Sequence, residues 1–108
     1  MKLSAIDVLT QIENLLFTNY VRFTSTIEYN DEIANIRYQL NLSTCIGDLV
    51  QKKLEILVQS MFEPARETCT FSYNLNKGVI SVRTKFDQDI IDLFFTDSER
   101  KTIINFDA

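Results

Sequence analysis

Four segments of the chain alternate between apolar and polar residues, and this period of two constrains the fold more than any other feature of the sequence. The segments cover residues 21–29, 34–42, 69–75 and 80–86. Such alternation is typical of β-strands with one buried and one solvated face, which antiparallel sheets allow. We therefore predict a four-stranded antiparallel sheet with one dry face and one wet face.

Turn residues divide these strands into two hairpins. Residues 30–32 (NDE) separate the first two strands, and residues 76–78 (NKG) separate the last two. Asparagine and aspartate favour turns through their own side-chain hydrogen bonds, and Gly78 adopts a positive φ at no steric cost.

Two segments with helical spacing precede the two hairpins. The first helix is predicted near residues 5–17, where Ser4 and Asp7 approximate a capping box. The second carries apolar residues through 46–61, with Ser43 or Thr44 as its cap. Pro64 disfavours a helical conformation at the preceding residue, so this helix is expected to end at Glu63.

A helical tail is predicted after the second hairpin. Asp87 stands at the N-terminal end of a helix whose apolar side carries Ile90, Ile91 and Phe94, and there an acid interacts favourably with the helix dipole. Thr96 and Glu99 match a second capping box, which predicts a further short helix through Ile103, Ile104 and Phe106.

The predicted element order is α-β-β-α-β-β-α in a single α+β domain, residues 1–108, and its two halves are alike. Residues 33–40 (IANIRYQL) parallel 79–86 (VISVRTKF), and residues 26–30 (TIEYN) parallel 70–74 (TFSYN). Arg37 and Arg83 coincide in this alignment. We predict a two-layer sandwich with all helices on the dry face and a possible internal αββ duplication.

Several classes of chemistry are disfavoured by the composition. The chain has no histidine, which removes most catalytic triads, acid-base relays and zinc sites, and its two glycines make no phosphate-binding loop. Cys45, near a helix start, would be an activated thiol without a base, and it is interpreted as a small cap residue. We therefore expect neither an enzyme nor a metal or cofactor site. The absence of a long apolar run predicts a cytoplasmic protein without a membrane span.

The wet face of the predicted sheet is basic, although the chain has a net charge of −4. Glu28 is the only acid among its strand positions, and the bases are Arg22, Arg37, Arg83 and Lys85. One interpretation is a binding surface for an acidic protein, a peptide or a nucleic-acid backbone. The other is an ordinary solvated face. Because the strand aromatics fall on the dry face, base stacking is not expected, and nucleic acid is the less favoured ligand.

The C-terminal segment FDQDIIDLFFTDSER mixes five acids with five large apolar residues. Helices that cover the core account for each acid and are favoured over a phosphate-mimicking surface. The apolar residues nevertheless exceed what one helix stripe needs, so Leu93 and Phe95 are predicted to contact a partner or a second copy, with Asp89 and Asp92 at the rim. Replacing Phe95 with aspartate would then disrupt association and leave the monomer folded.

In its element order the chain resembles the small acidic α/β chaperones of secretion systems, which implies a homodimer that binds unfolded client segments. It is similar in size and acidity to small phage proteins that block host defence enzymes. Our leading prediction is a non-catalytic protein-binding module that acts as an acidic inhibitor or adaptor, as a homodimer. The alternatives are a secretion-type chaperone, or a nucleic-acid or nucleotide binder that uses the basic sheet face.

Overall fold

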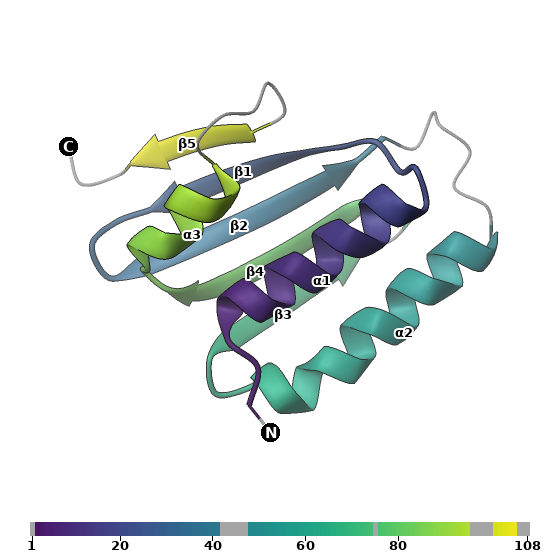
Figure 1. Cartoon of the computed structure of the whole chain (residues 1–108), viewed down its shortest axis with the longest axis horizontal. Coiled ribbons are helices and arrows are strands. Elements are labelled where there is room, and N and C mark those ends of the chain that lie inside the picture. Colours follow the sequence, from purple (N-terminus) through teal and green to yellow (C-terminus); the bar gives the residue numbers. More distant parts are fainter. Residues whose placement is uncertain (1, 42–47, 75, 96–100, 106–108) are drawn as a thin grey trace.

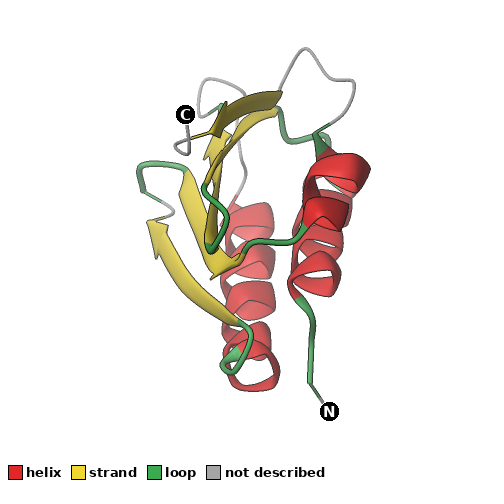
Figure 2. Ribbon diagram, turned by 90° about the vertical axis from the view of Figure 1, so that its left-hand side faces the viewer, coloured by secondary structure: helices red, strands yellow, loops and turns green. Residues whose placement is uncertain are grey.

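In the residues that it describes, the computed structural model shows a mixed α+β fold built from a sheet and three helices (Figure 1). It describes residues 2–41, 48–74, 76–95 and 101–105. The elements are α1 (Ala5–Thr18), β1 (Phe23–Tyr29), β2 (Ile33–Leu40), α2 (Asp48–Ala65), β3 (Cys69–Asn74), β4 (Val79–Lys85), α3 (Gln88–Phe94) and β5 (Lys101–Asn105). Figure 2 shows the described helices on one side of the sheet and the opposite face open.

Among the described residues, the sheet has five strands in the order β3-β4-β2-β1-β5. Its first four strands pair antiparallel, as predicted, but β5 runs parallel to β1, so the sheet is mixed. The prediction of a helix through Ile103 and Ile104 was wrong. β-branched residues suit a pleated strand, and the edge of β1 supplies the backbone partners that residues 101–105 need. Phe106 and the predicted Thr96–Glu99 cap lie outside the described residues.

The helix ends follow the predicted caps where the structure describes them. The backbone N–H of Asp7 donates to Ser4 Oγ at 3.2 Å, and the Asp7 carboxylate accepts from the Ser4 backbone, which confirms the capping box. The Asp87 side chain accepts from the N–H of Asp89 at 2.9 Å and caps α3. Helix α2 continues past the predicted end at Glu63 to Ala65, and the Pro64 carbonyl accepts from the N–H of Leu3 at 2.8 Å. The predicted caps Ser43 and Thr44 lie outside the described residues.

The two hairpins are related by a local two-fold axis in their pairing register. Thr26 lies opposite Arg37, and Thr70 lies opposite Arg83 in the same way. The axis passes between Ile36 and Val82, which face each other where β2 meets β4. The helices do not share this relation, because α1 lies between α3 and α2 over the middle of the layer (Figure 1). The matching register thus relates the two hairpins, whereas the helix positions count against a repeated αββ unit.

One continuous core fills the space between the helices and the sheet. Helix α1 contributes Val8, Leu9, Ile12 and Leu16, all fully buried, and its partners on the sheet include Ile36, Tyr38, Ile80 and Val82. Burying one such aliphatic side chain contributes roughly 1.5–3 kcal/mol to folding. The core therefore uses only the dry face, and the other face of the sheet is left for contact with solvent or a partner.

Candidate functional site

The four bases predicted on the wet face line up along the central strand β2. Lys85 lies beside Ile33 and Arg83 beside Asn35, and Arg37 belongs to β2 itself. We call Arg22, Arg37, Arg83 and Lys85 the basic track.

The track continues past the end of β2 to Arg22. The backbone N–H of Asn41 donates to the Arg22 carbonyl at 2.8 Å, which places this base beside the residue that follows β2. From position 33 to position 41 the chain advances by eight residue steps, or about 26 Å when extended. The four bases are therefore distributed along one strand direction, as an extended acidic ligand would require.

None of the four bases forms an ion pair within the described part of the chain. The described ion pairs lie elsewhere: Lys2 with Glu67, and Arg66 with Glu63 at 3.1 Å. Arg22, Arg37, Arg83 and Lys85 are all exposed. A partner could thus bind these side chains without first breaking an internal ion pair.

Arg37 and Arg83 form the centre of the track. Arg37 faces Ser81 and Arg83 faces Asn35, so the two arginines are diagonal neighbours across β2 and β4. Diagonal neighbours in an antiparallel pair lie about 7–8 Å apart, within reach of one carboxylate or phosphate for two long side chains. Arg37 and Arg83 therefore lie next to each other, on either side of the local two-fold axis.

Polar groups and shallow hollows surround the two arginines. A depression of about 50 Å³ is lined by Thr26, Glu28, Asn35 and Arg37. A larger open hollow of about 240 Å³ at the start of β3 is lined by Ile33, Arg66, Glu67, Thr68, Cys69, Thr70, Arg83, Thr84 and Lys85. The half-buried carboxylate of Glu28 is the acid on the strands of this face, as predicted. The surroundings offer hydroxyl and amide groups as additional hydrogen-bond partners for an anion.

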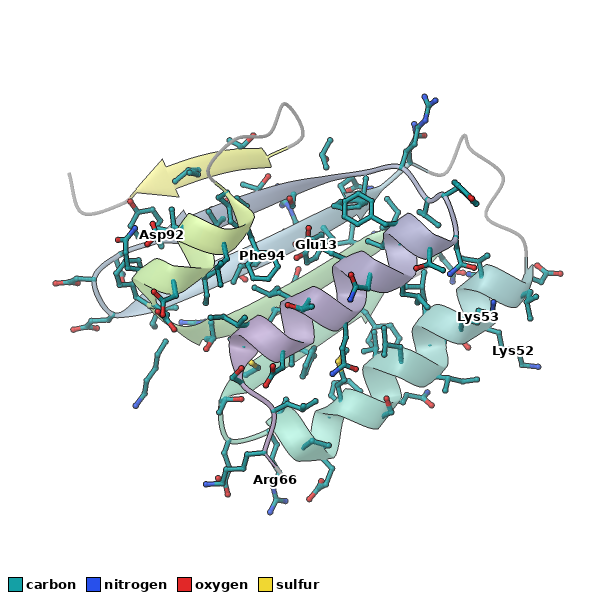
Figure 3. All side chains as sticks on the ribbon, in the orientation of Figure 1. Glu13, Lys52, Lys53, Arg66, Asp92 and Phe94 are labelled. Atoms are coloured by element: carbon teal, nitrogen blue, oxygen red, sulfur yellow. The ribbon has the colours of Figure 1, made fainter. Side chains whose placement is uncertain are left out.

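The structure separates the residues of the predicted C-terminal contact. Leu93 is 64% exposed, and Asp89 and Asp92 are exposed on the same helix, α3 (Asp92 is labelled in Figure 3). Phe95, in contrast, is only 4% exposed and belongs to the core. It follows the last residue of α3 as its C-cap, so helical periodicity did not predict where its side chain points.

A buried polar pair was not predicted from the sequence. Tyr38 Oη donates to Glu13 Oε2 at 2.6 Å, and the Glu13 side chain lies between α1 and the sheet (Figure 3). Burial, together with the charge of Glu13 and this hydrogen bond, raises the pKa of Tyr38 well above its ordinary value. The available signal was the place of Glu13 next to Ile12 in an otherwise apolar helix stripe.

Of the two thiols, the structure describes only that of Cys69. Cys69 is buried in the core, and burial raises the pKa of its thiol. Cys45 lies outside the described residues. The described residues contain no group of three or more histidine, cysteine, aspartate or glutamate side chains that could hold a metal ion.

No family model, curated protein or solved structure matches this chain. None of its described helices is long and apolar enough to span a membrane.

Proposed function

We propose that the protein is a cytoplasmic, non-catalytic protein-binding module that acts as an inhibitor or adaptor and binds an acidic partner through the basic track. The observation that carries this proposal is the positive charge of the open face, which is opposite in sign to the net charge of the chain. Four exposed bases without ion partners among the described residues lie on the uncovered face of a chain whose net charge is −4. Charge complementarity of this kind steers association and selects partners.

A protein partner fits the open face better than a nucleic acid. Single-stranded nucleic acids are bound by stacking their bases on exposed aromatic rings. The aromatic strand residues of this chain, among them Phe23, Tyr38 and Phe71, point instead to the helix side, where they pack with other rings. The described strand positions of the open face therefore offer charge and hydrogen bonds but no aromatic ring for stacking.

The proposal is tested by titrating the protein into a fluorescein-labelled peptide of ten alternating glutamate and threonine residues. Fluorescence anisotropy at low salt should show binding that weakens as salt is added. Replacing both Arg37 and Arg83 with glutamate should weaken binding about 10-fold to 100-fold, because two attractive contacts become repulsive.

A matched variant separates the surface from the net charge. Lys52 and Lys53 project from α2 on the helix side of the molecule (Figure 3), so their replacement with glutamate changes the net charge equally without touching the open face. This control should bind the peptide within about threefold of the unmodified protein. Equal loss in both double variants would reject the basic track. Tighter binding of a single-stranded oligonucleotide of ten residues would reject the choice of a protein partner.

For self-association we propose the surface of α3 around Leu93. This exposed leucine is flanked by Asp89 and Asp92, the arrangement of an apolar contact with a charged rim. Phe95 takes no part in this proposal, because it is buried.

A further inference from the structure

The β3 edge of the sheet has no strand partner among the described residues. β3 is the terminal strand in the order β3-β4-β2-β1-β5 and pairs only with β4. Proteins commonly protect such edges with lysine, proline or a bulge. The sequence of β3, CTFSYN, contains neither lysine nor proline, and it pairs with β4 residue by residue over its whole length. Within the described residues, the edge is thus open to a further strand.

Three aromatic rings lie together on the helix side of this edge, and we call Phe62, Phe71 and Tyr73 the aromatic ledge. Phe62 of α2 packs edge-on against Phe71 of β3, with ring centroids 5.3 Å apart, and lies 6.0 Å from Tyr73. Phe62 is 38% exposed, and Phe71 and Tyr73 are half-buried. A strand added beside β3 would therefore place its helix-side residues next to apolar surface that is still partly in water.

The opposite edge of the same sheet shows what such a position accepts. Phe71 follows Thr70, which faces Arg83, and Ile27 follows Thr26, which faces Arg37, so the two residues correspond under the local two-fold relation. Ile27 lies beside Ile103 of β5, a strand of five residues. β5 thus occupies the edge of β1 that corresponds to the free edge of β3.

We infer that the β3 edge binds an extended segment of a partner protein by strand addition. An apolar side chain of that segment would lie beside Phe71 and contact the aromatic ledge. Backbone hydrogen bonds to β3 supply affinity for an extended chain in general, and the ledge selects an apolar residue at alternate positions. This surface is distinct from the basic track, so one partner could engage both or two partners could bind independently.

The test uses the full-length ¹⁵N-labelled protein and an acetylated, amidated peptide with the β5 sequence KTIIN. Titrated to millimolar concentration, the peptide should shift the backbone amide signals of β3 and slow their hydrogen exchange at least about tenfold at saturation. The same peptide with alternate backbone amides N-methylated should not bind, because it cannot pair with a strand.

Two alanine variants on α2 examine the ledge. Phe62→Ala should weaken peptide binding at least about fivefold, since it removes the ring above Phe71. Ile56→Ala removes a more exposed residue, 62% accessible, of the same helix and should leave binding unchanged. Shifts at β1 instead of β3 would mean that the peptide displaces β5 and would overturn the inference. So would β3 amides that are already protected in the free protein at concentrations where it dimerises, because a second copy would then occupy the edge. The absence of any shift would overturn it as well.

Discussion

Replacing Tyr38 with phenylalanine should destabilise the protein although it removes a single oxygen atom. Tyr38 is fully buried, and its hydroxyl donates to the buried carboxylate of Glu13, which is itself only 6% exposed. The ring of Tyr38 also packs edge-on against Phe23, a contact that phenylalanine would keep. A hydrogen bond to a charged group contributes about 1.5–3 kcal/mol, and we expect a loss of that size at pH 7.

The pH dependence of this loss has a definite sign. Burial, the charge of Glu13 and the hydrogen bond raise the pKa of Tyr38 well above 10.0 in the folded state. Well below pH 10 the hydroxyl is protonated in both states, so the stabilisation is fully present. As the pH rises further, the unfolded chain ionises first and stability falls, by about 0.8 kcal/mol at about pH 10.5. Tyr38→Phe lacks this component, so its deficit relative to the unmodified protein should shrink at alkaline pH.

Urea unfolding followed by circular dichroism measures both effects. Tyr29→Phe is the control, because the Tyr29 hydroxyl has no hydrogen-bond partner among the described residues and its ring stacks on Phe86. The control should change the free energy of unfolding by less than about 0.5 kcal/mol. A Tyr38→Phe protein as stable as the control, or a deficit that stays constant from pH 7 to about pH 10.5, would refute the reasoning.

Three further substitutions test the C-terminal segment and the first helix. Phe95→Asp should abolish the cooperative thermal transition, because it buries a charge at a cost of about 4 kcal/mol or more. A variant that stays folded and loses only self-association would instead support the contact between Phe95 and a partner that the sequence predicted. Leu93→Asp should leave the free energy of unfolding within about 0.5 kcal/mol but weaken dimerisation in sedimentation equilibrium at least about tenfold. An unchanged dimer would place self-association elsewhere. Ser4→Ala removes the cap of α1 and should lower the free energy of unfolding, measured in urea, by about 1 kcal/mol. An unchanged free energy of unfolding would mean that the cap does not stabilise the protein.

The first four strands could be predicted because their signal is local. Each alternates over a whole strand, and the turn residues between them determine the hairpins. β5 could not be predicted in this way, because the five residues KTIIN are too few to show a period that separates a strand from a helix end. Its partner β1 lies far away in the sequence, and that pairing decides its conformation.

The candidate site was predictable in part for the same reason. Strand periodicity placed Arg22, Arg37, Arg83 and Lys85 on one face, but only the strand order brings Arg37 next to Arg83. Phe95 follows the end of a helix, where the 3.6-residue period no longer determines the side-chain direction, and so its burial was missed. The Glu13–Tyr38 pair depends on how α1 crosses β2, which is again a tertiary feature.

The central claim, that the open face binds an acidic protein, is tested most directly by comparative affinity capture. The unmodified protein, the Arg37→Glu/Arg83→Glu variant and the Lys52→Glu/Lys53→Glu variant would serve as baits, with the retained proteins quantified by mass spectrometry. We predict at least one acidic protein that the first and third baits retain and the second loses by about tenfold or more. The same proteins in equal amounts on all three baits would contradict the claim.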